Sequence, residues 1–295
     1  MLGVHGVGGS NPPVPTIPSP SLGPISIDGP EERTGPMKRS DEALILLCND
    51  DGYHREGIQI LFRRLRVLGR TVIVAPDQEK SASSFSLTLR RPLRVHRRKT
   101  DVWAVDGTPA DCIYFALQKV LPRRPDLIIS GMNPGPNLGQ QDANYSGTIA
   151  AAIQGTFLGI PSFAVSLIAD ASGRFPLTFA AGVVQDIAGR ILSAGLPEGV
   201  TLNVNIPPPP VRGARLTRLG RKFYNPEVVE KTDPRGLSYY WIGTGTPSQD
   251  CEKGTDLEAT RKKYISITPL QPDRTCREAL KFRSLGPLTR GLPSG

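Results

Sequence analysis

Short apolar runs alternate with amphipathic segments along the central part of the chain. The first run, Ala43 to Cys48, is continuously apolar, which is typical of a parallel strand buried on both faces. From about Glu56 to Leu68, apolar residues recur at three- and four-residue spacing, which predicts a helix, and Gly69 suits its C-terminal cap. A second apolar run, Thr71 to Ala75, follows at once. Together these segments predict a strand-helix-strand unit with a right-handed crossover.

The same alternation continues to about residue 205. It predicts a ribbon at Leu93 to Val105, helices at Thr108 to Val120, Ser146 to Leu158 and Leu177 to Ala194, and strands at Asp126 to Ser130, Ser162 to Leu167 and Thr201 to Asn205. Strands that alternate with helices indicate an open, mostly parallel sheet that carries helices on both faces. The expected fold class is therefore α/β and Rossmann-like.

The chain has a different character after the proline run Pro207 to Pro210. Three extended pieces follow, at Ala214 to Leu219, Tyr239 to Ile242 and Tyr264 to Thr268. Asp233-Pro-Arg-Gly236 is a strong turn signal between them. We expect C-terminal β-hairpins that are appended to the sheet domain rather than an independent fold.

Glycine and proline are frequent, and their positions divide the chain. The sequence has 31 Gly and 29 Pro in 295 residues, and they are concentrated near the N-terminus. The first 40 residues have no apolar periodicity and too little bulk to offset the entropy of ordering. We predict a disordered extension at 1–40, one domain at 41–283 with a protruding hairpin at about 225–245, and a flexible tail at 284–295.

Charge and cysteine content limit the classes of partner. The formal net charge is +9, but the basic residues are spread thinly and are not interleaved with aromatic residues. We therefore expect no dedicated nucleic-acid groove. No segment reaches the roughly 18 consecutive apolar residues of a membrane span. The four cysteines are widely separated and form no CxxC pair, which fits neither a zinc site nor a disulfide framework and predicts a cytoplasmic protein.

Polar clusters follow the predicted strands at the points where the strands end. Asn49-Asp50-Asp51-Gly52 follows the first strand, and a serine-rich segment that begins at Ser81 follows the second. Asn133 lies in a loop rich in Asn, Pro and Gly, and Ser146-Gly147-Thr148 opens the helix behind that loop. Ligands of open parallel sheets bind outside the carboxyl ends of the strands, so we expect these clusters to share one site.

Two adjacent carboxylates at the mouth of a buried strand are costly unless a positive charge compensates them. Hard divalent cations prefer carboxylate, hydroxyl and amide oxygens. Asp50, Asp51, Ser81 and Asn133 make such an all-oxygen set, which would suit Mg²⁺ or Mn²⁺. The alternative interpretation of the Asp pair is a turn that also caps the next helix, because Asp-Gly turns are common.

The helix start at Ser146, Gly147 and Thr148 presents amides where the partial positive charge of a helix favours phosphate. An ordinary serine N-cap is the alternative. A cation beside such amides favours a phosphate ester as substrate. The chain lacks GxGxxG after the first strand, GxxxxGK[ST] and GxSxG, which argues against dinucleotide binding, a P-loop NTPase and a serine hydrolase.

Two other polar positions near this edge have structural explanations. Asp111 stands three residues after Thr108, as in a capping box in which Asp takes the place of Glu. His54 stands beside the acidic turn, and we expect it to be a surface residue rather than a catalyst.

Five motifs occur in order, each at a strand end or a helix start. They are Leu47-Cys-Asn-Asp-Asp-Gly52, Ala75-Pro-Asp77 leading into Ser81 and Ser86-Leu-Thr88, Gly107-Thr-Pro-Ala-Asp111-Cys112, Ser130-Gly-Met-Asn133-Pro-Gly-Pro-Asn137 and Tyr145-Ser-Gly-Thr148. Over about Ala43 to Leu270 the chain resembles the SurE family of metal-dependent survival-protein nucleotidases. The resemblance implies a phosphomonoesterase that hydrolyses nucleoside 5′- and 3′-monophosphates to nucleoside and phosphate, with short polyphosphate as a further substrate.

The resemblance also implies roles for the residues of the predicted metal site. Asp50, Asp51, Ser81 and Asn133 would ligate one divalent cation, Mg²⁺ or Mn²⁺. Asp50 or Asp51 would be catalytic by orienting or deprotonating the attacking water, and direct attack by an aspartate through a phosphoenzyme is the alternative.

Asn137 and the helix start at 146–148 would then lie around the phosphate of the substrate. The stretch from Asp233 to Ile242 resembles the family's protruding hairpin, which exchanges between subunits, so a homodimer or homotetramer is expected. The rival functions are a receiver-like Mg²⁺-binding module and a non-catalytic nucleotide-binding module for signalling. A receiver would be about half this length and would want a Lys where this chain has Ser166 to Asp170.

Overall fold

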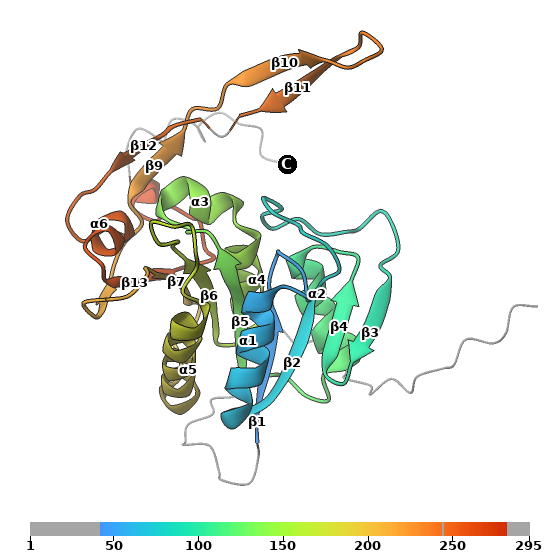
Figure 1. The fold of residues 1–295 in the computed structure, drawn as a ribbon. Helices are drawn as coiled ribbons and strands as arrows, with labels where there is room; N and C mark the ends of the chain where they lie inside the picture. Colours follow the sequence, from blue (N-terminus) through green and yellow to red (C-terminus); the bar gives the residue numbers. More distant parts are fainter. Residues whose placement is uncertain (1–41, 244, 282–295) are drawn as a thin grey trace, which may run out of the picture.

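The computed structural model describes residues 42–243 and 245–281 (Figure 1). Nine strands in these ranges form the central sheet: β1 (Ala43–Cys48), β2 (Gly69–Pro76), β3 (Val95–Lys99), β4 (Val102–Val105), β5 (Leu127–Pro134), β6 (Ser162–Leu167), β7 (Thr201–Ile206), β8 (Ala214–Leu216) and β13 (Ile265–Leu270). Their order across the sheet is β3-β4-β2-β1-β5-β6-β7-β13-β8. Most neighbours run parallel, while β3 is antiparallel to β4 and β13 is antiparallel to β7. The predicted Rossmann-like α/β sheet is confirmed.

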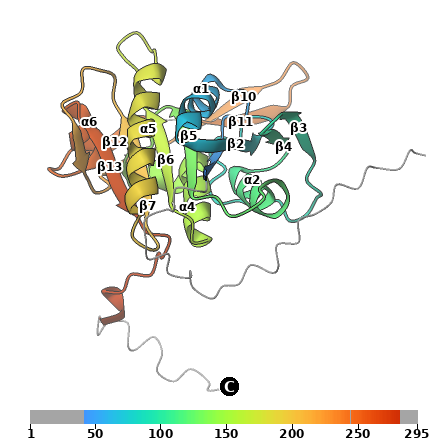
Figure 2. The same cartoon turned by 90° about the horizontal axis from the view of Figure 1, so that it is seen from below.

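Helices cover both faces of this sheet, as predicted. Figure 2 shows α1 (Glu56–Arg64) and α5 (Leu177–Ala194) on one side and α2 (Pro109–Phe115) and α4 (Gly147–Phe157) on the other. All six residues of β1 are buried between these layers, which explains why that strand is continuously apolar. No helix of the described residues is long and apolar enough to cross a membrane.

The order of the strands places a switch point beside β1. Strand β2 pairs with one edge of β1 and strand β5 pairs with the other, with Cys48 opposite Ser130. The chain therefore leaves the carboxyl ends of β1 and β5 in opposite directions. In doubly wound sheets this divergence is where ligands bind.

The first predicted helix boundary is wrong. Helix α1 ends at Arg64, a 3₁₀ turn follows at Leu65–Val67, and Gly69 opens β2 instead of capping the helix. Gly69 has a φ of +156°, and a Cβ there would lie 2.1 Å from the carbonyl oxygen of Ala43. Glycine is needed because β1 and β2 approach closely at this point, which the sequence pattern does not reveal.

The C-terminal part follows the hairpin prediction only in part. Strands β10 (Val228–Thr232) and β11 (Ser238–Ile242) form an antiparallel hairpin, called the arm below, and β9 (Arg221–Tyr224) pairs with β12 (Pro247–Asp250). The turn at Asp233 is confirmed, since its carboxylate accepts the amides of Arg235 and Leu237. However, β8 and β13 extend the main sheet rather than a hairpin. The arm projects away from the sheet (Figure 1).

Two short helices were not predicted. They are α3 (Gly139–Tyr145), in the segment expected to be loop, and α6 (Asp256–Arg261), between β12 and β13. The capping box at Thr108 and Asp111 is confirmed, and His54 is exposed as expected. The extension predicted at 1–40 and the tail predicted at 284–295 lie outside the described residues.

Candidate active site

Asp50 and Asp51 lie directly after β1, beside the switch point. Their exposed fractions are only 5% and 7%. Asn49 builds the turn that holds them: its side-chain amide donates to the carbonyl of Gly52 at 3.0 Å and accepts the amide of Gly52 at 3.1 Å. The sequence therefore places two carboxylates at a fixed and largely buried position.

The carboxylate of Asp50 is bound by the start of α4. The Thr148 hydroxyl donates to Asp50 Oδ1, and the Thr148 backbone contributes a second hydrogen bond. The main-chain carbonyl of Asp50 accepts the amide of Lys80 at 2.7 Å, which ties the loop after β2 to the same point. Burial raises the pKa of Asp50, although the hydrogen bonds with Thr148 oppose this shift.

Asp51 has less support from the protein. Its Oδ2 atom is buried and has no hydrogen-bond partner among the described residues. Burial, together with the negative charge of Asp50, raises the pKa of Asp51 to about 7, and Arg55 only partly offsets this. Two adjacent buried carboxylates, one with an unpartnered oxygen, fit a hard divalent cation, which would compensate both charges.

Ser81 and Asn133 are oriented so that each leaves an oxygen for such a cation. The exposed Ser81 hydroxyl donates to Glu79 Oε1 at 2.8 Å, so its lone pairs stay free for another contact. The Asn133 side-chain nitrogen donates to the carbonyl of Gly135 at 2.7 Å, so its side-chain carbonyl oxygen is the atom that could bind a cation. Asn133 leaves the same edge of the sheet as the Asp pair, because Ser130 stands opposite Cys48. Ser81 lies on the same side, because the amide of its neighbour Lys80 donates to the carbonyl of Asp50.

The helix start at Ser146 is an N-cap, as the alternative interpretation held. Its hydroxyl accepts the amide of Ile149 at 3.1 Å. Gly147 lies against Asp50, since a Cβ at this position would be 2.8 Å from Asp50 Cβ and 2.9 Å from Asp50 Oδ2. Any side chain at Gly147 would therefore displace the carboxylate, which accounts for the glycine. The start of α4 thus meets the Asp pair directly.

A comparison with protein families shows where this arrangement belongs. The family model described as survival protein SurE matches residues 45–226, which include the Asp pair, Ser81, Asn133 and the start of α4. The chain belongs to the SurE family.

Individual SurE proteins are similar along most of the chain. The "5′-nucleotidase SurE" of Pelobacter propionicus is 48% identical, covering 80% of this chain and 96% of the relative. The protein of the same name from Syntrophotalea carbinolica is 45% identical, covering 84% and 96%. The crystal structure of the SurE protein from Aquifex aeolicus has 40% sequence identity and a TM-score of 0.71, and covers 83% of this chain and 99% of that chain.

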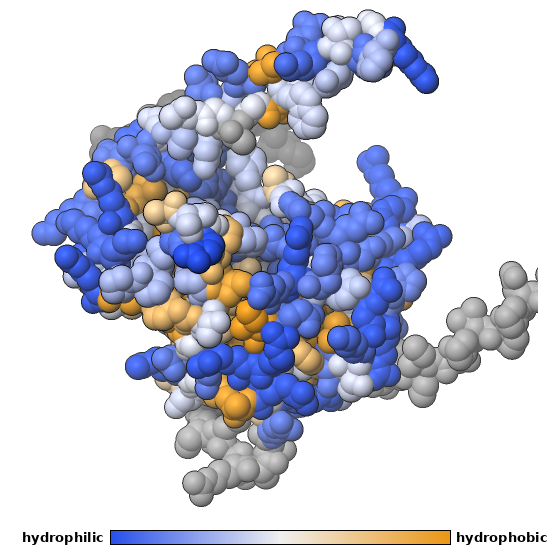
Figure 3. Space-filling model, in the orientation of Figure 1, coloured by the Kyte–Doolittle hydropathy of each residue, from blue (hydrophilic) through white to orange (hydrophobic). Residues whose placement is uncertain are grey.

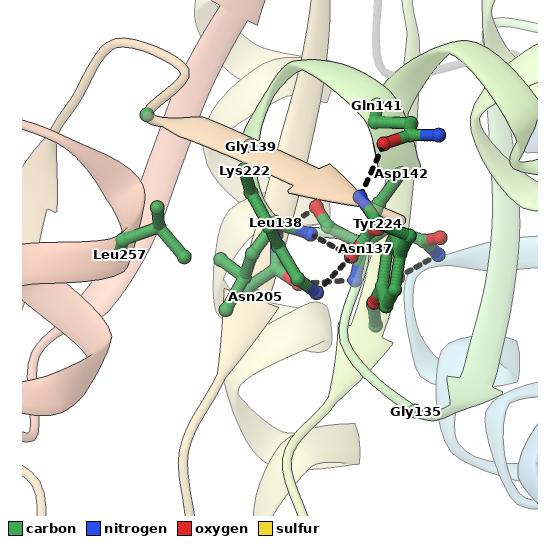
Figure 4. A network of polar contacts seen from close by, with 12 residues as sticks. Gly135, Asn137, Leu138, Gly139, Gln141, Asp142, Asn205, Lys222, Tyr224 and Leu257 are labelled. Atoms are coloured by element: carbon green, nitrogen blue, oxygen red, sulfur yellow. Dashed lines mark hydrogen bonds and ion pairs between the residues drawn. The ribbon is translucent and has the colours of Figure 1, made fainter. Parts of the chain in front are cut away.

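Asn137 of the SurE motif lies in a buried hydrogen-bond network (Figure 4). Its side-chain nitrogen donates to Ser166 Oγ in β6 at 2.7 Å, and its backbone amide donates to Asn205 Oδ1 in β7 at 2.9 Å. The side-chain nitrogens of Asn203 and Asn205 donate to its carbonyl oxygen at 2.9 and 3.1 Å. These bonds fix the loop around Asn137, which connects β5 to α3.

The same network joins α3 to the C-terminal part of the chain (Figure 4). Lys222 Nζ of β9 lies 2.6 Å from Asp142 Oδ2 of α3, and both side chains are about nine-tenths buried. Asp256 Oδ2 accepts the amide of Gly139 at 2.8 Å, at the start of α3. Burial opposes the charge of Lys222, but the hydrogen bonds to Asp142 and Tyr224 outweigh it and raise the pKa of Lys222. The SurE site is therefore braced by residues far away in sequence.

Sequence reasoning missed Arg55 and Glu79 of this SurE site. Arg55 Nε donates to the main-chain carbonyl of Asp51 at 3.3 Å, and its guanidinium pairs with Glu79 at 3.2 Å. Glu79 also accepts the Ser81 hydroxyl, so it joins two of the predicted metal-binding segments. Neither residue stands in a recognisable motif, and only the three-dimensional structure brings them together.

Proposed function

We propose that this protein is a metal-dependent 5′-nucleotidase that hydrolyses nucleoside 5′- and 3′-monophosphates to nucleoside and phosphate. The observation that carries the proposal is the buried Asp pair at the switch point, where Asp51 Oδ2 has no partner in the described part of the chain. The activity in the names of its SurE relatives supports the same reaction. Short polyphosphate is a further proposed substrate.

Asp50, Asp51, Ser81 and Asn133 are proposed to hold one divalent cation, Mg²⁺ or Mn²⁺. When bound, the cation would supply positive charge to the phosphoryl oxygens and to the attacking water. Asp50 is held in place by Thr148, so its carboxylate needs no rearrangement to bind. The Asp51 carboxylate oxygen that does not bind the cation would accept a hydrogen bond from the attacking water, and then its proton.

The start of α4 and the loop of Asn137 are proposed to surround the phosphate. Support for α4 comes from the contact of Gly147 with Asp50 and from the partial positive charge of a helix start. Asn137 would act mainly by holding its loop, because its side-chain nitrogen is already bonded to Ser166. Backbone amides in this region would stabilise the charge that grows on the phosphoryl oxygens during in-line attack by water.

The test of the function is phosphate release from a panel of nucleoside 5′- and 3′-monophosphates and short polyphosphates. We expect release with Mg²⁺ or Mn²⁺ and its loss in excess EDTA, with recovery when the metal is restored, because the Asp pair needs a compensating cation. The control variant is Asp101→Asn, which changes a partly exposed acid that pairs with Arg70. It should release phosphate as wild type does, which shows that purified variants of this protein keep their activity. Nucleotide binding without release from any substrate would support the non-catalytic module instead.

We also propose a homodimer or homotetramer formed through the arm. Large apolar side chains along the arm are exposed, among them Val228, Leu237, Tyr240, Trp241 and Ile242. Figure 3 shows apolar side chains, in orange, at the surface of the arm. A two-stranded hairpin is only marginally stable alone, and contacts with another subunit would cover this surface.

The arm can be tested by light scattering after size-exclusion chromatography. We expect Tyr240→Ser with Trp241→Ser to shift the protein towards the monomer, because these changes remove two large exposed apolar side chains. Tyr114→Ser is the matched control, since Tyr114 is also exposed but lies on α2. An unchanged molar mass for the arm variant would contradict the proposed assembly.

A cytoplasmic location is proposed as well. The support is that Cys48, Cys112, Cys251 and Cys276 are all free thiols in the structure. A reducing compartment keeps thiols in this state.

A further inference from the structure

Unpartnered buried oxygens gather at one edge of the sheet. Among the described residues, three buried side-chain oxygens lack a hydrogen-bond partner: Asp51 Oδ2, Ser83 Oγ and Ser130 Oγ. Ser130 lies in β5, and Asp51 and Ser83 lie in the loops that follow β1 and β2, the strands that surround the switch point with β5. A buried polar atom without a partner costs free energy, so each one needs an explanation. The proposed cation would supply a partner for Asp51, whereas neither Ser83 nor Ser130 is among the proposed metal ligands.

Ser83 Oγ lies beside the same residue, Gly147, as the Asp50 carboxylate. A Cβ on Gly147 would lie 3.0 Å from Ser83 Oγ and 2.9 Å from Asp50 Oδ2. The hydroxyl and the carboxylate therefore both lie against the start of α4. A hydroxyl can donate to an anionic oxygen, whereas Asp50 can only accept or bind a cation.

The backbone around Ser83 is held in a costly conformation. Both neighbours have left-handed φ values, +56° at Ala82 and +48° at Ser84, although neither is glycine or asparagine. Such strain persists only where surrounding contacts determine it, and it is concentrated at functional sites. The contacts here are the amide of Ser83 on the Lys80 carbonyl and the amide of Ser84 on the Tyr145 carbonyl, both at 3.2 Å.

Neighbouring serines differ from Ser83 in how their hydroxyls are used. The Ser81 hydroxyl donates to Glu79, and the Ser84 hydroxyl donates to the main-chain carbonyl of Asn144 at 2.8 Å. The hydroxyls of Ser81 and Ser84 thus each donate to a protein acceptor, whereas the hydroxyl of Ser83 has no partner in the described chain. This pattern fits a donor that is kept for a ligand.

We propose that Ser83 is a substrate-binding residue whose hydroxyl donates to a non-bridging oxygen of the phosphoryl group that is attacked at the Asp pair. The proposal rests on the proposed phosphomonoesterase function and adds a specific contact to it. The backbone on both sides of Ser83 is held before the substrate arrives. A hydrogen bond from its hydroxyl would strengthen as charge grows on the phosphoryl oxygens. The ligand chemistry is that of a phosphate monoester or its product, inorganic phosphate.

The test compares Ser83→Ala with wild type by steady-state kinetics and by calorimetric titration with inorganic phosphate in the presence of Mn²⁺. We expect kcat/KM to fall about 100-fold and the Kd for phosphate to rise about tenfold or more. The Kd for Mn²⁺ without phosphate should stay unchanged, and the Tm should not fall, because the lost hydroxyl had no partner in the described protein. Ser84→Ala is the matched control, and its effects on kcat/KM and phosphate binding should be much smaller.

The proposal is overturned if Ser83→Ala binds phosphate as wild type does, or if it loses Mn²⁺ affinity without phosphate, which would make Ser83 a metal ligand. An equal loss in Ser84→Ala would also overturn it, because the effect would then come from the shape of the loop. Phosphate binding is measured without turnover. An inactive wild-type protein would therefore refute the nucleotidase function separately from the contact of Ser83.

Discussion

Asp50→Asn is expected to lower the turnover of nucleoside monophosphates at least about 1,000-fold. A catalytic cation supplies several kcal/mol of charge stabilisation, and each 1.36 kcal/mol lost is about tenfold in rate. Asparagine keeps the size of the side chain and an oxygen that can accept the Thr148 hydroxyl, so the local packing should survive. The substitution removes the negative charge of Asp50, so only Asp51 is left to compensate the charge of a cation.

Stability measurements separate this loss from misfolding. Without metal, Asp50→Asn should melt at least as high as wild type, because burial raises the pKa of Asp50 and disfavours its charge. Addition of Mn²⁺ should raise the Tm of wild type and leave that of Asp50→Asn nearly unchanged. The matched control is Asp101→Asn, which removes a partly exposed partner of Arg70 and should retain full activity. Near wild-type phosphate release by Asp50→Asn at saturating metal would refute the metal site.

Lys222→Met is expected to lower the free energy of unfolding more than the other substitutions proposed for this protein. The pair of Lys222 with Asp142 is 2.6 Å long and almost fully buried. Removing the cation leaves the Asp142 carboxylate buried and uncompensated, which costs about 3–5 kcal/mol. For a domain of this size that corresponds to a fall in Tm of roughly 6–20 °C. Because α3 follows directly after the Asn137 loop, activity should decline with the stability of this region.

A double-mutant cycle shows whether the loss comes from the orphaned carboxylate. Lys222→Met combined with Asp142→Asn should recover much of the stability, because no charge is then buried, and the new side-chain amide can still accept the amide of Leu138. The exposed pair of Arg218 and Glu252 is the control, and Arg218→Met should cost less than about 1 kcal/mol. Unfolding is compared at one protein concentration, since assembly also affects Tm. If Lys222→Met and Arg218→Met lower the free energy of unfolding by the same amount, burial of the Lys222–Asp142 pair does not explain the loss.

Elements with strong local patterns were predicted almost to the residue. The predicted bounds of β1, β6 and α5 are those found in the structure. Helix α3 was missed because Gly139–Tyr145 has no apolar periodicity, and its support comes from Lys222 and Asp256, about 80 and 117 residues away. Helix α6 did carry a local signal, since Thr255 and Glu258 have capping-box spacing and the Thr255 hydroxyl accepts the Glu258 amide.

The residues of the candidate site also fall into two groups, those with a local sequence signal and those placed by contacts that are distant in sequence. Asp50 and Asp51 could be predicted because two carboxylates after a buried strand are unusual chemistry, and the capping role of Ser146 follows from its position. The bond of Thr148 to Asp50 spans 98 residues, so no local pattern could indicate it. Ser83 gave no signal either, because the left-handed conformation of Ala82 and Ser84 is not encoded by glycine or asparagine at those positions.

The position of the switch point also sets the order of events when the chain is made. Asp50 and Asn133 come from the ends of β1 and β5, and about 80 residues separate them. At roughly 5–20 residues per second, the ribosome needs several seconds to synthesise that interval. During this time the acidic turn has neither its neighbouring strand β5 nor the start of α4. With the proposed ligands Asp50 and Asn133, metal uptake would be a late step of maturation, and a bound cation would report that β1 and β5 have paired.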